Sequence, residues 1–400
     1  MSVFQLERDG DVDGLVETVM GSDNSSVRGR AVEALGGFED SNGQVVNTLV
    51  DVAVDDDDAA VRANAIDALD QLGLDAIERL LIAATDADQS SNVGPETFIE
   101  QLSAETAELR MAATYAVGRR EISRAIPELL DLMEDPDPRV RARAVRACGL
   151  IGDARALDAV RSAASDDVSA VRQAAAFGLG RYSGSDALAT LQGMLDDPNT
   201  AVRREAVIAL GGFGDLQPVD AVVGMLSDQA EPVRRAAVYA VIELLANAPT
   251  DRSHEIRETV VTALNRTEDR GVVEPLAEIL EESNQPLQRR NAAWLLGRLD
   301  LGTHENQVVG GLVETLDDQD DLAAQFAATS LASIGGPVAE EQLLEELDRT
   351  TGELKATIVF TLGKIGDERS KQRIDQLIDQ TDDPEVRKRA FAALSRLGGR

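Results

Sequence analysis

A Val-Arg pair that returns every 31 residues is the feature that most constrains how this chain folds. After each pair comes Ala at the fourth position, and three of the pairs are followed by Gly at the ninth. A period of this length is typical of stacked supersecondary units, in which each unit buries its apolar face only against its neighbours. The four regular copies are Val140-Arg141, Val171-Arg172, Val202-Arg203 and Val233-Arg234.

One repeat shows how the sequence encodes a helical hairpin. Asp137 is placed to cap a helix over residues 139–150, since its carboxylate can accept from the first backbone amides. Apolar residues at i, i+4, i+7 and i+8 give this helix one buried face, made of Val140, Ala144, Ala147 and Cys148. Gly149 and Gly152 predict its end. A second helix over residues 156–164 completes the hairpin.

Twelve copies of the Val-Arg helix can be aligned, and two of the intervals between them are irregular. The 48-residue interval after Val61 holds an insertion over residues 86–104. The 23-residue interval before Ile256 lacks room for a full first helix, so we expect an irregular, shortened repeat over residues 246–268. Otherwise the sequence predicts a single repeat array over residues 1–400.

These units resemble HEAT repeats, specifically the short variety of phycobilin-lyase-like proteins. The resemblance covers about residues 23–398 and rests on the turn Asp, the Val-Arg pair, and the Ala and Leu-Gly positions. It implies an all-α fold, a right-handed α-solenoid of about twelve helical hairpins, with the Val-Arg helices lining the concave face. It also implies a structural ladder between repeats, formed by each turn Asp and the Arg six residues later: Asp135/Arg141, Asp166/Arg172, Asp197/Arg203 and Asp228/Arg234.

The charge balance indicates a surface adapted to concentrated salt. The chain has 72 acidic and 39 basic residues, a net charge of −33, and four lysines. A composition this acidic and poor in aromatic residues is typical of disorder, but the apolar periodicity runs nearly from end to end. We therefore expect a folded protein from an extreme halophile, where salt screens the self-repulsion. An acidic protein from a mesophile is the alternative.

Simple sequence criteria predict a cytoplasmic protein. Cys148 stands alone, at a position where other repeats have Leu, which predicts a buried, inert thiol. The first residues lack the basic and apolar segments of a signal peptide. No run of 18 apolar residues predicts a membrane span.

The sequence contains no pattern typical of a catalytic, cofactor or metal site. Its two histidines occur as His254-Glu255 and His304-Glu305. Deoxyhypusine hydroxylases, a HEAT-like enzyme family, bind two irons with four His-Glu pairs, but the two pairs here fall at non-equivalent repeat positions. The Asp run over residues 55–58 lacks the spacing of an EF-hand loop. We expect no enzyme activity, no cofactor and no metal.

The position six residues after each Val is the candidate for contact with a partner. At about 100° per residue it lies opposite the buried face, so it should look into the concave groove. Five of the twelve aromatic residues occupy it, and arginines flank it. Because interfaces favour arginine and aromatic residues, we predict a partner-binding groove formed by Tyr115, Phe177, Arg204, Arg235, Tyr239, Arg290, Trp294 and Phe360. Alternatively, the aromatic residues pack between neighbouring helices.

Three functions fit this groove. The first is a non-catalytic scaffold that holds a protein partner or an acidic peptide. The second follows from the resemblance: a lyase-like accessory protein that handles an open tetrapyrrole. The third is nucleic-acid binding, which the net charge and the salt sensitivity of phosphate contacts both disfavour.

Overall fold

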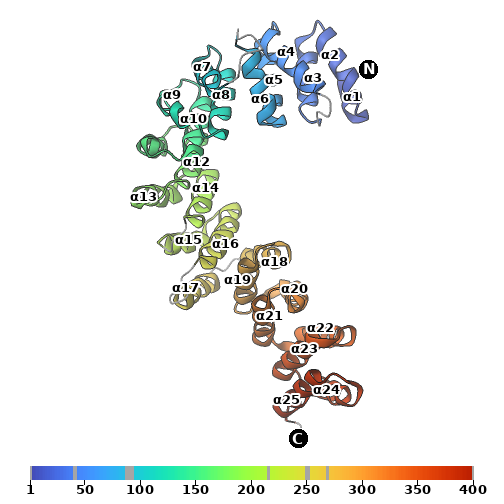
Figure 1. The fold of residues 1–400 in the computed structure, drawn as a ribbon. Helices are drawn as coiled ribbons and strands as arrows, with labels where there is room; N and C mark the ends of the chain where they lie inside the picture. Colours follow the sequence, from blue (N-terminus) through green and yellow to red (C-terminus); the bar gives the residue numbers. More distant parts are fainter. Residues whose placement is uncertain are drawn as a thin grey trace. The chain divides into compact units, whose positions relative to one another are not determined.

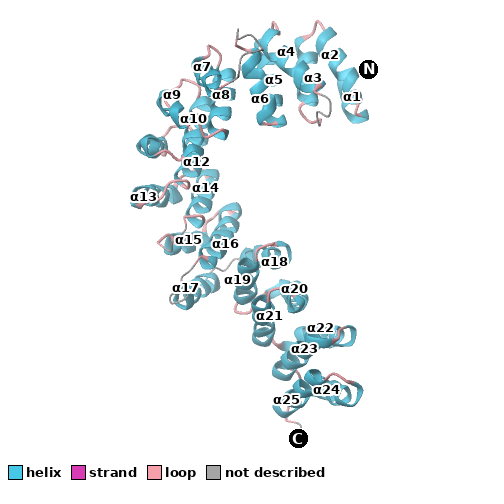
Figure 2. Cartoon of the chain, viewed as in Figure 1, coloured by secondary structure: helices cyan, strands magenta, loops and turns pink. Residues whose placement is uncertain are grey.

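The computed structural model describes residues 2–38, 43–85, 94–213, 217–247, 253–266 and 270–398. Every regular element in these ranges is a helix, as Figure 2 shows. The prediction of an all-α repeat solenoid is confirmed. The chain forms two compact units, Met1–Met194 and Leu195–Arg400, which are described separately below. A single array over the whole chain stays a prediction.

Unit 1 is built from helical hairpins whose second helices pack side by side (Figure 1). Its α-helices are α1 (Val3–Asp9), α2 (Val12–Gly21), α3 (Ser25–Leu35), α4 (Gln44–Asp55), α5 (Ala59–Leu72), α6 (Leu74–Ala83), α7 (Pro95–Glu100), α8 (Ala107–Arg119), α9 (Ile126–Leu132), α10 (Pro138–Ile151), α11 (Leu157–Ala163), α12 (Ser169–Leu179) and α13 (Ser185–Gly193). The Val-Arg helices among them are α3, α5, α8, α10 and α12.

Unit 2 repeats the same construction. Its α-helices are α14 (Thr200–Gly211), α15 (Val219–Gly224), α16 (Glu231–Ala246), α17 (Ser253–Arg266), α18 (Val273–Glu282), α19 (Pro286–Leu296), α20 (Glu305–Glu314), α21 (Asp321–Ile334), α22 (Gly336–Arg349), α23 (Gly352–Ile365), α24 (Glu368–Gln380) and α25 (Pro384–Arg396). The Val-Arg helices are α14, α16, α17, α19, α21, α23 and α25.

The predicted cap and buried face of α10 are confirmed. The Asp137 carboxylate accepts from the backbone amide of Arg139 at 2.8 Å. The four predicted apolar positions are at most 3% exposed. Val145, five residues after Val140, is also buried because α10 is packed between α8 and α12. The buried arc of a Val-Arg helix is therefore wider than the sequence pattern alone predicts.

The predicted role of Gly149 is wrong. The helix continues past it to Ile151, and Gly152, with φ of 67°, ends it. A Cβ atom added to Gly149 would lie 2.4 Å from the Cα atom of Gly178 in α12. The glycine is thus required for close approach of neighbouring Val-Arg helices and not for the helix end. The same contact recurs in unit 2, where a Cβ on Gly211 would lie 2.7 Å from Ala240.

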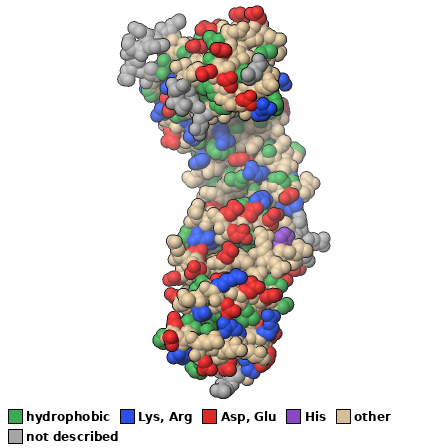
Figure 3. All heavy atoms as spheres, turned by 90° about the vertical axis from the view of Figure 1, so that its right-hand side faces the viewer, with side chains coloured by type: hydrophobic (Ala, Val, Ile, Leu, Met, Phe, Trp, Pro, Cys, Tyr) green, Lys and Arg blue, Asp and Glu red, His purple; other side chains and the backbone are tan. Residues whose placement is uncertain are grey.

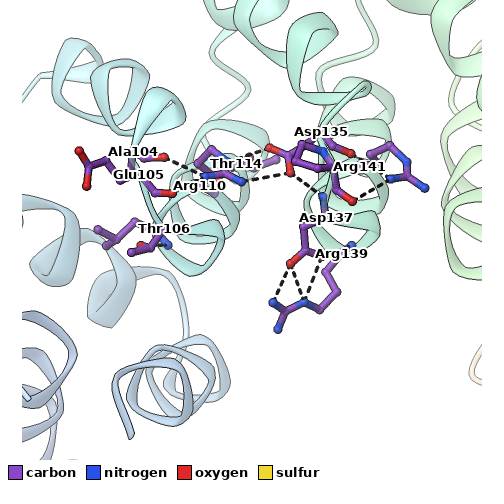
Figure 4. A network of polar contacts seen from close by, with 11 residues as sticks. Ala104, Glu105, Thr106, Arg110, Thr114, Asp135, Asp137, Arg139 and Arg141 are labelled. Atoms are coloured by element: carbon purple, nitrogen blue, oxygen red, sulfur yellow. Dashed lines mark hydrogen bonds and ion pairs between the residues drawn. The ribbon is translucent and has the colours of Figure 1, made fainter. Parts of the chain in front are cut away.

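The predicted ladder is confirmed, and Figure 4 shows part of it in unit 1. Arg141 Nε donates to the Asp166 carboxylate of the next turn at 2.9 Å, and its Nη1 donates to the Asp135 carbonyl of its own turn at 2.9 Å. Asp135 in turn accepts from Arg110 of the preceding repeat at 2.7 Å and from the Asp137 amide at 2.8 Å. Each arginine therefore fastens two successive turns.

The ladder continues elsewhere in both units with nearly the same geometry. The N···O distances are 2.8 Å for Arg28–Asp56, 2.8 Å for Arg203–Asp228 and 2.7 Å for Arg289–Asp318. Hydrogen bonds from Arg28 and Arg289 hold the pKa values of Asp56 and Asp318 below their usual range. These carboxylates therefore stay charged at lower pH than an ordinary Asp carboxylate does.

The insertion after α6 adds a small helical segment. Residues 86–93 lie outside the described residues, but α7 and the 3₁₀ helix η1 (Gln101–Ser103) pack against α8. Phe98 and Leu102 are buried at this contact. The described part of the insertion thus supports α8, the Val-Arg helix that follows it.

The shortened repeat in unit 2 changes which helices are neighbours. Residues 248–252 and 267–269 lie outside the described residues. α17 contacts α15 and α16, taking the place beside α15 where a first helix would follow. α18, a first helix by sequence, contacts α16, and α19 contacts α16 as well (Figure 1). The missing helix therefore brings a first helix against the face of a Val-Arg helix.

Candidate partner-binding surface

The sixth position after each Val is exposed at some repeats and covered at others. Ile208 of α14 is 43% exposed and Tyr239 of α16 is 41% exposed, whereas Trp294 of α19 is 7% exposed. Tyr115, Phe177 and Phe360 are half-buried. The prediction that all of these side chains are open to solvent holds for Tyr239 and is wrong for Trp294.

Guanidinium groups lie over the rings of Tyr115 and Phe177 in unit 1. Two of them contact Phe177, with the Arg146 Cζ 3.7 Å and the Arg181 Cζ 5.2 Å from the ring centroid. The Arg143 Cζ lies 5.9 Å from the Tyr115 ring, and the same guanidinium pairs with Asp70 of α5. Cation–π contacts of this kind keep the rings partly covered while leaving charged groups at the surface.

Trp294 is covered by two arginines of unit 2. The Arg298 Cζ lies 3.9 Å and the Arg257 Cζ 5.7 Å from its ring centroid. Arg257 also reaches the Phe326 ring, at 5.8 Å. Sequence reasoning missed Arg257, whose position directly after Ile256 marks a ladder residue.

Phe360 stands in a cluster of three cations. Lys364 Nζ lies 4.5 Å from the ring centroid, and the Arg396 and Arg389 Cζ atoms lie at 5.0 and 5.4 Å. The ring also lines a cleft of about 580 Å³ between α21 and α23. Carboxylates from Asp317, Asp321 and Glu353 contribute to the same lining, together with Lys364 and Arg389.

Arg235 and Tyr239 meet one carboxylate from α18. Arg235 forms an ion pair with Glu278, and the Tyr239 hydroxyl donates to the same carboxylate at 3.1 Å. The hydrogen bond from Arg235 lowers the pKa of Glu278. Glu278 was missed because it belongs to a first helix, which reaches this face only through the shortened repeat.

The two remaining predicted residues differ in their surroundings. Arg204 of α14 is exposed and has no ion-pair partner in the part of the chain that the structure describes. Arg290 of α19 pairs with Asp320, and this contact lowers the Asp320 pKa to about 2. Because Asp320 also caps α21 through the Ala323 amide at 2.8 Å, we assign Arg290 a structural contribution in addition to its predicted one.

The predicted set therefore does not form one uniform stripe. Within unit 2, Arg204, Ile208, Arg235 and Tyr239 lie on the adjacent helices α14 and α16, and α18 borders them. Arg290, Trp294 and Phe360 lie on α19 and α23, beyond the shortened repeat. Figure 3 shows carboxylate side chains spread over the face that it draws, with Lys and Arg interspersed.

The histidines offer no shared site among the described residues. His304 ends the 3₁₀ helix η7 (Gly302–His304) before α20, and the side chain of His254 lies outside the described residues. Within the described ranges there is no cluster of three or more His, Cys, Asp or Glu side chains that could hold a metal ion. Across the same ranges no helix is both long and apolar enough to cross a bilayer.

Comparison with known families identifies the repeat. The family model for HEAT repeats matches residues 12–92, 95–176, 166–242, 242–332 and 340–400. The chain belongs to the HEAT-repeat family. The family is therefore the one that the repeat units resemble, and the matches cover both irregular intervals except residues 93–94.

A curated HEAT-repeat relative is similar along its whole length. It is a HEAT repeat-containing taxis protein of Halobacterium salinarum, 48% identical over 404 residues that cover 100% of this chain and 99% of the relative. The source of this relative, a halophile, agrees with the predicted high-salt surface.

The similar solved structures are more distant in sequence. An engineered protein is 21% identical with a TM-score of 0.42, covering 97% of this chain and 99% of that one. The CpcE–CpcF complex of phycocyanin lyase from Nostoc sp. PCC7120 is 21% identical with a TM-score of 0.37, covering 62% of this chain and 98% of that one. Kap95p bound to RanGDP is 14% identical with a TM-score of 0.42, covering 99% and 68%. At this distance the likenesses carry no argument about ligands.

Proposed function

We propose that this chain is a non-catalytic scaffold that binds a protein partner within a taxis system. The observation that carries the proposal is the end-to-end match, at 48% identity, to a HEAT-repeat protein whose name assigns it to taxis. Repeat solenoids suit such a role because stacked hairpins present long, regular surfaces with no need for a catalytic centre.

The best-supported contact surface within unit 2 is the one that α14 and α16 share. Ile208 and Tyr239 expose apolar area there, and Arg204 and Arg235 lie beside them. In concentrated salt, long-range attraction between charges is screened, so apolar contacts and short-range guanidinium contacts should dominate recognition. Arg204 is the guanidinium of this group that has no carboxylate partner among the described residues, which leaves it available to a partner.

The experiment compares variants in a host that lacks its own copy of this protein. The double substitution Arg204→Ala with Tyr239→Ala should abolish taxis responses and co-purification of the partner at high salt. Phe391→Ala, which removes an aromatic residue that is 59% exposed on α25, is the matched control and should leave both unchanged. Melting curves of both variants should stay close to that of the wild type.

Two results would contradict the proposal. Normal taxis in the strain that lacks the protein would show that the protein is not needed for taxis. Full partner recovery by the double variant, with folding intact, would remove this surface as the contact site.

A further inference from the structure

Arg257 of α17, which aligns with the ladder arginines by sequence, has no carboxylate partner among the described residues. In regular repeats, the ladder arginine pairs with an Asp of the next repeat. This Asp lies five residues before the Val of that repeat's Val-Arg pair, as Asp166 does for Arg141. For Arg257 of α17 that position, five residues before Gln288, holds Ser283. Arg257 forms no ion pair with any described carboxylate. It donates from Nη2 to Asn291 Oδ1 at 3.0 Å, and its buried Nε has no hydrogen-bond partner in the described part of the chain.

The guanidinium groups of Arg257 and Arg298 both contact the ring of Trp294. The Cζ atoms of Arg257 and Arg298 lie 5.7 and 3.9 Å from the centroid of the Trp294 ring. Arg298 donates from Nη1 to the Trp294 carbonyl at 2.9 Å, which fixes its position, and it too has no ion-pair partner among the described residues. Both arginine side chains are half-buried.

Both guanidinium groups of the pair are partly desolvated, and neither has a neutralising carboxylate among the described residues. Burial, reinforced by the like charge of Arg298, lowers the pKa of Arg257. Burial also lowers the pKa of Arg298, and the nearby Glu258 carboxylate acts in the opposite sense without forming an ion pair with it. Elsewhere in unit 2, Arg235 and Arg290 are neutralised by Glu278 and Asp320. Two desolvated, unneutralised cations in a chain of net charge −33 are costly unless an anion joins them.

We propose that Arg257, Arg298 and Trp294 form a site for the carboxylate side chains of an acidic segment of a protein partner. The proposal rests on the proposed scaffold function and names the chemistry that unit 2 recognises. A guanidinium binds a planar carboxylate through two parallel hydrogen bonds, and its weak hydration lowers the cost of removing water. The Trp294 and Phe326 rings add apolar surface for the side chains next to the acidic residue.

The protein carries its own reporter for this site, because Trp294 is its single tryptophan. The full chain is titrated at constant high ionic strength with a short peptide of Asp, Glu and Leu, and with the same peptide bearing Asn and Gln in place of the acids. The acidic peptide should change the Trp294 fluorescence saturably and bind at least about tenfold more tightly than its amide counterpart.

Substitutions then assign the binding to the two arginines. Arg257→Gln and Arg298→Gln should each weaken the acidic peptide about tenfold. Arg349→Gln, which removes an arginine that is 69% exposed on α22, is the control and should bind like the wild type. If a variant fails to fold by circular dichroism, the comparison of the two peptides on the wild-type protein still decides the proposal.

Several outcomes would overturn the carboxylate site. They are equal binding of the acidic and amide peptides, an unchanged Trp294 signal with the acidic peptide, and acid binding that survives both substitutions. An equal saturating response to inorganic phosphate would mean a general small-anion site. Because the titration uses the purified chain, it can fail while the taxis phenotype and partner capture persist, so the two proposals are tested separately.

Discussion

Gly149 of α10 and Gly178 of α12 approach so closely that a Cβ atom on the first would lie 2.4 Å from the Cα atom of the second. The atom that such a Cβ would meet belongs to the backbone of α12, which cannot move aside as the end of a flexible side chain can. The spacing of α10 and α12 is therefore set by glycine, which explains why the ninth position of the α10 repeat is Gly.

Gly149→Ala should destabilise the protein by about 1–3 kcal/mol, since the two helices must move apart to admit the methyl group. Gly193→Ala is the control, because its Cβ would meet no atom within 4 Å and its backbone needs no positive φ. That change should be neutral or stabilise by about 0.5–1 kcal/mol. Chemical denaturation at high salt measures both, and equal effects would contradict the close-packing role.

Asp166→Asn should cost about 2 kcal/mol at neutral pH, because it removes a charge-assisted bond from Arg141. That bond is the first cause of the lowered pKa of Asp166. A lowered folded-state pKa means that the stabilisation is complete above about pH 4, the usual Asp value, and is lost as the pH falls below it. The difference in unfolding free energy between variant and wild type should therefore shrink in acid. A difference independent of pH would show that the ion pair does not stabilise the fold.

Cys148 should be inert in the native protein. It is fully buried, and desolvation raises the pKa of its thiol to about 12. A thiolate-directed reagent at pH 8 should modify Cys148 only after unfolding, with a rate at least about a hundredfold slower in the folded state. Mass spectrometry before and after denaturation measures the fraction of Cys148 that is modified. Rapid labelling of the native protein would mean that α10 opens locally.

Lowering the salt concentration should lower the melting temperature. At a net charge of −33, self-repulsion opposes the folded state, and the screening length grows from about 3 Å at 1 M salt to about 10 Å at 0.1 M. Melting curves across KCl concentrations test this, with a non-ionic osmolyte at matched water activity as the control. A melting temperature indifferent to KCl would contradict adaptation to salt.

Contacts that are local, or that every regular repeat makes in the same way, could be predicted from the sequence. The Asp137 cap is a contact within a few residues, and the ladder bond from Arg141 to Asp166 joins positions that every regular repeat holds at the same separation. Such features are predictable because they depend only on residues within one repeat or on the constant spacing between neighbouring repeats. The exposure of the sixth position was only partly predictable, since neighbours widen the buried arc, as Val145 shows.

The sequence by itself determined the helical hairpins, their caps, their buried faces and the ladder, because these follow from helical periodicity and from repetition of one unit. Only the tertiary structure decided that α18 meets Tyr239, that Trp294 is covered, and that Arg257 lies beside it without a carboxylate. The physical reason is the missing first helix before α17. Where first helices and Val-Arg helices no longer alternate, the neighbours of a side chain depend on how the remaining helices pack around the missing one. No local sequence pattern specifies this packing.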